Sequence, residues 1–308
     1  MRALVFPGQG TQFVGMGEAE YRAGGEFSRL CDQANQILGR DLTSIMFNGP
    51  ADLLNQTVNT QPAIFLYCCG LLNEMAATPS NCLLSGHSIG EYVAYYFSGA
   101  ISFEDCLTVV GKRAEGMQRA SRINPGTMAA IIGLDSKLID ALCFRIAVSV
   151  GPVYIACFNS PDQTVISGCR KAVEEVLREA EEAGARRAEV IPVSGAFHTP
   201  LMKPAEVLLK QALDAIAMTN PGVPVFANVD GSQVISCERI HPNLMLQLTS
   251  PVKWVTVVER MCEAGADEFI EVGPGKVLRG LIRRIVPGMR VTNISDFAQA
   301  RSFRDAAT

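Results

Sequence analysis

The sequence predicts an α/β fold in which a large subdomain, built on a mainly parallel sheet, carries an inserted ferredoxin-like small subdomain. Three observations predict it. Strand-like and helical segments alternate over residues 1–122, a β-α-β-β-α-β order follows over 128–193, and simple alternation then returns. We therefore assign residues 1–124 and 195–308 to the large subdomain and 125–194 to the small one.

In the first part of the chain, short apolar runs predict strands and longer patterned runs predict helices. The apolar stretch 63–72 is too short to span a bilayer. It predicts a buried helix that begins at Thr60-Gln61-Pro62, because proline favours the first turn of a helix. The expected elements are strands at 3–6 and 82–85 and helices at about 26–38, 61–77, 89–97 and 103–121.

The order of strands and helices changes after Asn124-Pro125-Gly126 and becomes the ferredoxin-like order β-α-β-β-α-β. The second helix of this unit has the clearest pattern, because Val173, Val176 and Leu177 fall on one face and Gly184 ends it. The expected elements are strands at 128–133, 154–158, 164–167 and 188–193 and helices at about 136–147 and 170–183.

The last third of the chain is expected to complete the first sheet. His241 is placed in the loop 239–242, and the tail beyond residue 286 is left unassigned. The expected elements are helices at about 203–216, 253–263 and 277–285 and strands at 223–228 and 268–272.

Composition excludes several classes of function. Of the 308 residues, 48% are hydrophobic and 19% charged, and the formal net charge of −4 gives no reason to expect nucleic acid or an anionic membrane as partner. The start of the chain lacks a secretion signal, so we expect a cytoplasmic protein. A monomer is expected as well, although no feature of the sequence fixes the oligomeric state. The ten cysteines show no C-x-x-C and no zinc spacing. Reduced core thiols and no metal are therefore expected.

The pentapeptide Gly86-His87-Ser88-Ile89-Gly90 has the pattern G-x-S-x-G between a strand-like run and a helical one. This is the arrangement of a nucleophile elbow, in which glycines let the chain turn sharply and present a serine oxygen at the head of a helix. The large subdomain is therefore expected to be α/β-hydrolase-like, with Ser88 as a nucleophile for acyl transfer. The alternative is an ordinary glycine-rich turn between strand and helix.

A serine hydroxyl needs a base, and the chain has three histidines. The side chain of His87 should diverge from that of Ser88, whereas His198 lies between a strand and a helix, where active-site residues gather in open sheets. We choose His198 as the base, and the alternative is a histidine that caps the following helix or is hydrogen-bonded in a loop. About 110 residues follow it, unlike the late histidine of α/β-hydrolases. No acidic third member is evident, so a backbone or amide carbonyl could orient the ring.

Two glycine-rich loops fail as nucleotide-binding motifs. The loop 6–12 has Phe13 where a dinucleotide fingerprint needs glycine, and 273–276 has Ile270 and Val277 at key positions of a phosphate loop. Oxyanion donor and structural turn are the remaining interpretations. Arg113 lies at the edge of an apolar helical stripe. Helix geometry alone favours a snorkelling arginine over a guanidinium clamp for a carboxylate.

Taken together, a set of motifs resembles the family of malonyl-CoA:acyl carrier protein transacylases in register from residue 2 to about 286. The motifs are Phe6-Pro7-Gly8-Gln9-Gly10, the Ser88 pentapeptide, Lys112-Arg113, Met128-Ala129-Ala130, Asn159-Ser160-Pro161, Ala196-Phe197-His198, Gln247-Leu248 and Glu271-Val272-Gly273-Pro274-Gly275-Lys276. Two departures are modest: Ile89 stands where leucine is common, and Ala114-Glu115-Gly116 replaces the usual Gly-Lys-aromatic run.

The resemblance implies a ping-pong reaction in which Ser88 takes malonyl from malonyl-CoA and passes it to the phosphopantetheine thiol of acyl carrier protein. It implies no cofactor and no metal. It makes His198 the general base and acid, oriented by the main-chain carbonyl of Gln247. The oxyanion hole would be formed by the N–H groups of Gln9 and Ile89. Substrate-binding residues would be Arg113, which pairs with the malonyl carboxylate, Phe197, which favours malonyl over methylmalonyl, and His87, Met117 and Asn159.

Three alternatives stay open from the sequence. A relative that serves a polyketide synthase in trans would use the same residues. A serine hydrolase such as a thioesterase would release the acyl group to water. A catalytically idle module would only bind the carrier, although Ser88, His198 and Arg113 are all present. Lysines and arginines near the cleft are expected to meet an acidic carrier.

Overall fold

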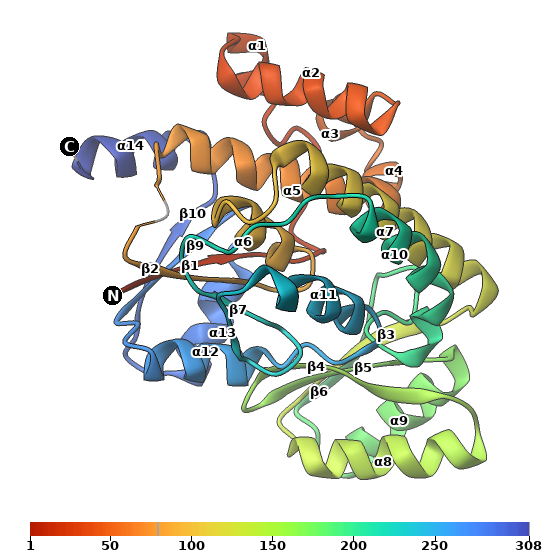
Figure 1. Cartoon of the computed structure of the whole chain (residues 1–308). Helices are drawn as coiled ribbons and strands as arrows, with labels where there is room; N and C mark the ends of the chain where they lie inside the picture. The colour runs from red at the N-terminus through yellow and green to blue at the C-terminus, as the bar shows by residue number, and fades with distance from the viewer. Residues whose placement is uncertain (79, 308) are drawn as a thin grey trace.

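The computed structural model describes residues 1–78 and 80–307, which form two sheets with separate roles (Figure 1). The first sheet has the strand order β10-β9-β1-β2-β7-β8. All its pairings are parallel except β7 with β8. The strands are β1 (Arg2–Phe6), β2 (Cys82–Gly86), β7 (Val225–Phe226), β8 (Gln233–Val234), β9 (Glu268–Val272) and β10 (Arg290–Ile294).

Helices cover both faces of this sheet, which explains why β1, β2 and β9 are buried almost throughout. Figure 1 shows α5 above the sheet and α12 and α13 below it. The helices of this part are α1 (Glu18–Ala23), α2 (Glu26–Leu38), α3 (Leu42–Asn48), α4 (Ala51–Leu54), α5 (Thr57–Glu74), α6 (Gly90–Phe97), α7 (Phe103–Ile123), α10 (Glu206–Asp214), α11 (Ile240–Thr249), α12 (Trp254–Glu263), α13 (Val277–Ile285) and α14 (Phe297–Ala307), with 3₁₀ turns η1 (Pro200–Ala205) and η2 (Cys237–Arg239).

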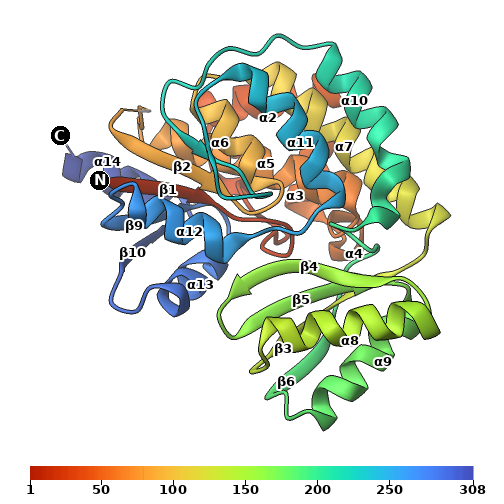
Figure 2. The same cartoon turned by 60° about the horizontal axis from the view of Figure 1, so that its bottom comes forward.

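The second sheet is antiparallel, with the order β4-β5-β3-β6 and the chain order β-α-β-β-α-β. Its helices lie together on the face turned away from the first sheet (Figure 2). Alternate residues of β3 separate the two sides: Ala129 and Ile131 pack with the helices, and Met128 and Ala130 join the main core. The elements are β3 (Thr127–Ile132), α8 (Ser136–Ser149), β4 (Val153–Ser160), β5 (Gln163–Gly168), α9 (Arg170–Glu182) and β6 (Arg187–Ile191).

The α/β fold with one mainly parallel and one antiparallel sheet is confirmed. The division of the chain at 124/125 and 194/195 stays a prediction. Among the described residues, no helix is both long and apolar enough to cross a membrane.

Helix α5 begins at Thr57, so the prediction of a start at Thr60-Gln61-Pro62 was wrong. Pro62 lies inside the helix, where it cannot donate to the carbonyl of Val58. The guanidinium of Arg40 donates to that carbonyl instead, which satisfies it. A proline inside a helix is therefore accommodated here by a partner far away in the sequence.

Three further expectations were wrong in the last third of the chain. The helix expected at 203–216 is divided into η1 and α10, because Pro204 interrupts it. The strand expected at 223–228 pairs only over Val225–Phe226. His241 lies in α11 rather than in a loop, and Pro242 is tolerated because it falls in the first turn.

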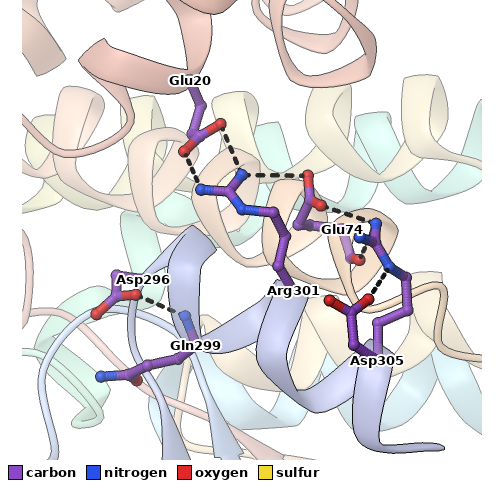
Figure 3. Close-up of polar contacts among 7 residues, drawn as sticks. Glu20, Glu74, Asp296, Gln299, Arg301 and Asp305 are labelled. Atoms are coloured by element: carbon purple, nitrogen blue, oxygen red, sulfur yellow. Dashed lines mark hydrogen bonds and ion pairs between the residues drawn. The ribbon is translucent and has the colours of Figure 1, made fainter.

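The unassigned tail forms β10 and α14, which extend the sheet and pack on α5. Figure 3 shows Arg301 of α14 pointing to Glu20 of α1, and the two side chains are 3.0 Å apart. Arg304 of the same helix forms an ion pair with Glu74 of α5 at 2.9 Å. Such half-exposed ion pairs contribute at most about 1 kcal/mol each. The ring of Phe297 packs 4.8 Å from that of Phe27, centroid to centroid, so apolar packing holds the helix as well.

Candidate active site

Ser88 lies at the turn between β2 and α6. Its φ of +54° is a left-handed backbone conformation that residues other than glycine rarely adopt. The turn is tight because its glycines allow close backbone contact. A Cβ on Gly86 would lie 2.0 Å from the carbonyl carbon of Gly90, and one on Gly90 would lie 2.1 Å from the carbonyl oxygen of Phe6. The strand, turn and helix expected for a nucleophile elbow are therefore all present.

His198 faces Ser88 across the junction of the two sheets. Its Nε2 lies 2.8 Å from Ser88 Oγ, and its Nδ1 lies 3.0 Å from the main-chain oxygen of Gln247. A carbonyl oxygen only accepts hydrogen bonds, so Nδ1 carries the proton and Nε2 is free to accept from the serine hydroxyl. The carbonyl thus fixes the tautomer that a general base requires.

The environment of His198 keeps its imidazole neutral. Burial, together with the positive charge of Arg113, lowers the pKa of His198 to about 3. At neutral pH the ring is therefore unprotonated and able to take a proton from Ser88.

Arg113 of α7 is fully buried, so its interpretation as a snorkelling arginine was wrong. Its Nη1 donates to Gln61 Oε1 at 2.6 Å, and its Nη2 lies 3.1 Å from Ser88 Oγ and 3.0 Å from Gln247 Oε1. The guanidinium also lies 5.3 Å from the centre of the Tyr92 ring. Burial lowers the pKa of Arg113. The direct hydrogen-bond partners are neutral, which suits the group to receive an anion.

A cavity of about 220 Å³ opens in front of Ser88 and His198. Five other residues that the sequence placed in the site line it: Gln9, His87, Met117, Asn159 and Phe197. Ile89, Arg113 and Gln247 are not among the lining residues. Arg113 and Gln247 nevertheless contact the reacting side chains, Arg113 through Ser88 Oγ and Gln247 through His198 Nδ1. Apolar side chains from the second sheet, from the segment after β6 and from α13 complete the lining: Met128, Cys157, Val165, Ile191, Val193, Val277, Leu278 and Leu281.

His87 connects the elbow to the second sheet. Its Nε2 lies 3.0 Å from Asn159 Oδ1 on β4, and its ring packs 5.7 Å from that of Trp254, centroid to centroid. Burial lowers the pKa of His87. The side chain thus points away from the Ser88 hydroxyl, as the sequence predicted, and is engaged elsewhere.

The loop 273–276 is a structural turn, as predicted. A Cβ on Gly273 would lie 2.5 Å from the ring of Pro7, so the turn packs directly against the loop that carries Gln9. Glu271 then accepts from the N–H groups of Leu278 and Arg279 and caps α13.

Three polar residues of the site were missed. Gln61 anchors Arg113, and Asn228 accepts from the Ser88 N–H at 2.7 Å. Glu91 binds Gln247 and Asn228. Their signals were weak: a polar residue inside an apolar helix, an asparagine that ends an apolar run, and a glutamate directly after the pentapeptide. Within residues 1–78 and 80–307, no three histidine, cysteine, aspartate or glutamate side chains gather as metal ligands.

Comparison with known proteins agrees with the resemblance that the sequence motifs carry. The model of the acyl transferase domain family matches residues 3–299. A malonyl CoA-acyl carrier protein transacylase from Bacillus subtilis is 39% identical over 96% of this chain and 93% of its own. The solved structure of that transacylase from Coxiella burnetii has a TM-score of 0.93 at 36% identity and covers 99% of this chain and 96% of its own.

A malonyl-transacylase solved in complex with a type II polyketide synthase acyl-carrier protein has a TM-score of 0.91 at 37% identity, with 99% of both chains covered. Similarity therefore extends over sequence, fold and nearly full length. The chain belongs to the acyl transferase domain family, among the malonyl CoA-acyl carrier protein transacylases.

Proposed function

We propose that this chain transfers malonyl from malonyl-CoA to the phosphopantetheine thiol of acyl carrier protein, through a malonyl ester on Ser88. One observation carries the proposal: Ser88 Oγ lies within hydrogen-bond distance of both a neutral base, His198, and a buried cation, Arg113. The first contact suits acyl transfer, and the second suits an acyl group that bears a carboxylate. Malonyl combines the two requirements.

In the first half-reaction, Ser88 Oγ attacks the thioester carbonyl while its proton passes to His198 Nε2. The carbon–sulfur bond then breaks, and the proton leaves with the sulfur of coenzyme A. In the second, His198 takes the proton of the carrier thiol, and the sulfur attacks the ester. The proton returns to Ser88 Oγ as the ester bond breaks. No group besides the two thiols and the chain's own side chains is needed.

The negative oxygen of each tetrahedral intermediate would be bound by the N–H groups of Gln9 and Ile89. In the part of the chain that the structure describes, neither N–H donates to another group. Ile89 also stands directly before α6, at the positive end of the helix. Two free donors at this place are what oxyanion stabilisation requires.

Selectivity is assigned to the groups around the cavity. Arg113 would pair with the malonyl carboxylate, and the bulk of Phe197 and Met117 would leave little room for a branched acyl group. His87 and Asn159 line the same cavity from opposite sheets and would contact the substrate. Ser88 is only 9% exposed, which restricts the access of water to the ester.

Incubation with malonyl-CoA is the decisive test. We expect the intact-mass spectrum to gain one malonyl group, which peptide mapping places on Ser88, and Ser88→Ala to gain none. Addition of phosphopantetheinylated carrier should then discharge the enzyme and load the carrier. A spectrum without an adduct would refute the proposal. Release of free malonate as fast as transfer would favour a serine hydrolase instead.

An acidic carrier would meet the basic side chains of α13. This helix lines the cavity through Val277, Leu278 and Leu281, and Lys276, Arg283 and Arg284 are exposed beside them. Positive charge at the mouth of a cleft accelerates the approach of a negative partner. We therefore place the carrier against this helix.

Arg283→Glu is expected to raise the KM for acyl carrier protein about tenfold, because a like charge at the rim of an interface slows association. Lys171→Glu on α9 makes the same change of charge away from the cavity and is the matched control. Steady-state transfer at low and high salt measures both variants. Equal KM values for the two variants would show that α13 does not contact the carrier. An increase of KM for malonyl-CoA alone would instead mean that Arg283 contacts the phosphates of coenzyme A.

Fatty-acid synthesis is the pathway that we propose for a monomer in the cytoplasm. The polyketide synthase complex favours a second candidate, because its transacylase is 37% identical to this chain. Transfer rates to a fatty-acid carrier and to a polyketide carrier, compared as kcat/KM, decide between them. Light scattering during gel filtration measures the oligomeric state.

A further inference from the structure

We propose that Glu91 is a positioning residue that holds Ser88, His198 and Arg113 in one arrangement, an inference that rests on the proposed malonyl transfer. Glu91 lies in the first turn of α6 and is fully buried. Its Oε2 accepts from the backbone N–H of Asn228 at 3.1 Å and from Gln247 Nε2 at 2.7 Å. These two residues come from separate parts of the chain and meet at this carboxylate.

The two partners of Glu91 bind Ser88 from both sides. Asn228 Oδ1 accepts from the Ser88 N–H at 2.7 Å, and Gln247 Nε2 donates to the Ser88 carbonyl at 3.0 Å. Ser88 has a positive φ, so its peptide groups need partners that hold the strained turn in place. Glu91 supplies this support indirectly, because it fixes the side chain of Gln247 and the backbone of Asn228.

Gln247 also contacts the other two reacting groups. Its side-chain oxygen accepts from Arg113 Nη2 at 3.0 Å, and its main-chain oxygen lies 3.0 Å from His198 Nδ1. One residue thus connects the nucleophile, the base and the cation. The orientation of its side-chain amide decides whether all of these contacts form together.

The charge of Glu91 fixes that orientation. The amide NH₂ faces the carboxylate of Glu91, and the amide oxygen faces the guanidinium of Arg113. A flipped amide would place oxygen against carboxylate and NH₂ against guanidinium, and the contact with the Ser88 carbonyl would be lost as well. A neutral side chain at position 91 weakens this preference even if it fills the same volume.

The carboxylate is expected to titrate in the range where the enzyme is assayed. Burial raises the pKa of Glu91 to about 7, although its N–H donors and Arg113 oppose the shift. The groups that face it are Arg113 on α7, Tyr95 on α6 and the neutral amides of Gln247 and Asn228. The charged form therefore prevails above about pH 7. His198, with a pKa of about 3, does not change its charge there.

The test compares Glu91→Gln with the wild type in the malonylation half-reaction across about pH 5.5 to 9. The wild-type kcat/KM should rise through about pH 7. The variant should lack that rise and lie roughly 10- to 100-fold below the wild-type plateau, because misplacement of reacting groups costs about that much. Its side-chain oxygen can still accept from both N–H groups, so the fold should persist.

The thermal stability of Glu91→Gln distinguishes a residue that positions the reacting groups from one that only stabilises the fold. The folded state raises the pKa of Glu91, so ionisation of Glu91 lowers stability as pH rises. The Tm of Glu91→Gln at about pH 8 should therefore equal or exceed that of the wild type while its activity is reduced. Glu271→Gln, which also removes a buried carboxylate, is the matched control and should keep the wild-type pH profile.

Three outcomes would overturn the inference. The first is a Glu91→Gln profile that coincides with the wild type. The second is a loss of activity that only follows a loss of folded protein, and the third is an equal loss of the pH-dependent rise in Glu271→Gln. Absence of malonylation in the wild type is a different result, because it refutes the proposed function itself.

Discussion

His198→Ala is expected to slow the formation of malonyl-Ser88 by roughly 10⁴-fold or more, as the loss of a catalytic base does in serine enzymes. In the structure, His198 Nε2 lies 2.8 Å from Ser88 Oγ, and no other neutral base shares that contact among the described residues. Without it the hydroxyl must react while still protonated. Single-turnover mixing with malonyl-CoA, quenched and analysed by mass, measures the rate.

His241→Ala is the matched control for this variant. His241 lies on α11, at the surface, where its Nε2 contacts Asp214 at 3.0 Å. Its removal should leave the rate of malonylation unchanged. Comparable losses in the two variants would mean that His198 supports the fold rather than the chemistry, and a His198→Ala enzyme with wild-type rates would require another base.

The sheets could be predicted because their signals are local. Strands β1 and β2 are short apolar runs, and the alternation of strands and helices in 125–194 is enough to identify the antiparallel unit. The tail was not predictable in this way. Strand β10 gains its stability from pairing with β9, and α14 from Phe297 and from ion pairs with α1 and α5, all distant in the sequence.

Some residues of the site could likewise be predicted from local sequence, and others could not. Ser88 and His198 were predictable because each stands in a distinctive local pattern after a strand. Helix geometry placed Arg113 at the edge of the stripe but could not show that α5 and α11 enclose it. Gln61 and Asn228 act through contacts that join distant segments. The role of single polar residues of this kind can be recognised only when the fold shows which distant residues they contact.

Arg113→Ala is expected to lower kcat/KM for malonyl-CoA by roughly 10²- to 10⁴-fold and to raise acetyl transfer relative to malonyl transfer. The guanidinium is fully buried and bonded to neutral groups, so a carboxylate would be its only charged partner within the cavity. Loss of a buried charge-assisted contact costs several kcal/mol. Paired assays with malonyl-, methylmalonyl- and acetyl-CoA measure the ratio.

Two variants control for packing and charge. Arg119→Ala removes an exposed arginine from the same helix and should leave the ratio unchanged. Arg113→Lys keeps the charge but cannot bind a carboxylate through two parallel N–H groups, so an intermediate loss is expected. A malonyl-to-acetyl ratio that stays constant in Arg113→Ala would exclude the clamp.

The direction of the acetyl effect follows from the resting contacts of Arg113. With no acyl group bound, its Nη2 lies 3.1 Å from Ser88 Oγ and 3.0 Å from Gln247 Oε1. Malonyl replaces these neutral contacts by a charged one, whereas an acetyl group offers nothing in exchange and leaves the buried guanidinium without an anion in direct contact. The wild-type enzyme therefore discriminates against acetyl through an unsatisfied charge. Removal of that charge abolishes both the penalty against acetyl and the preference for malonyl. The rates of acetyl and malonyl transfer should therefore converge in Arg113→Ala.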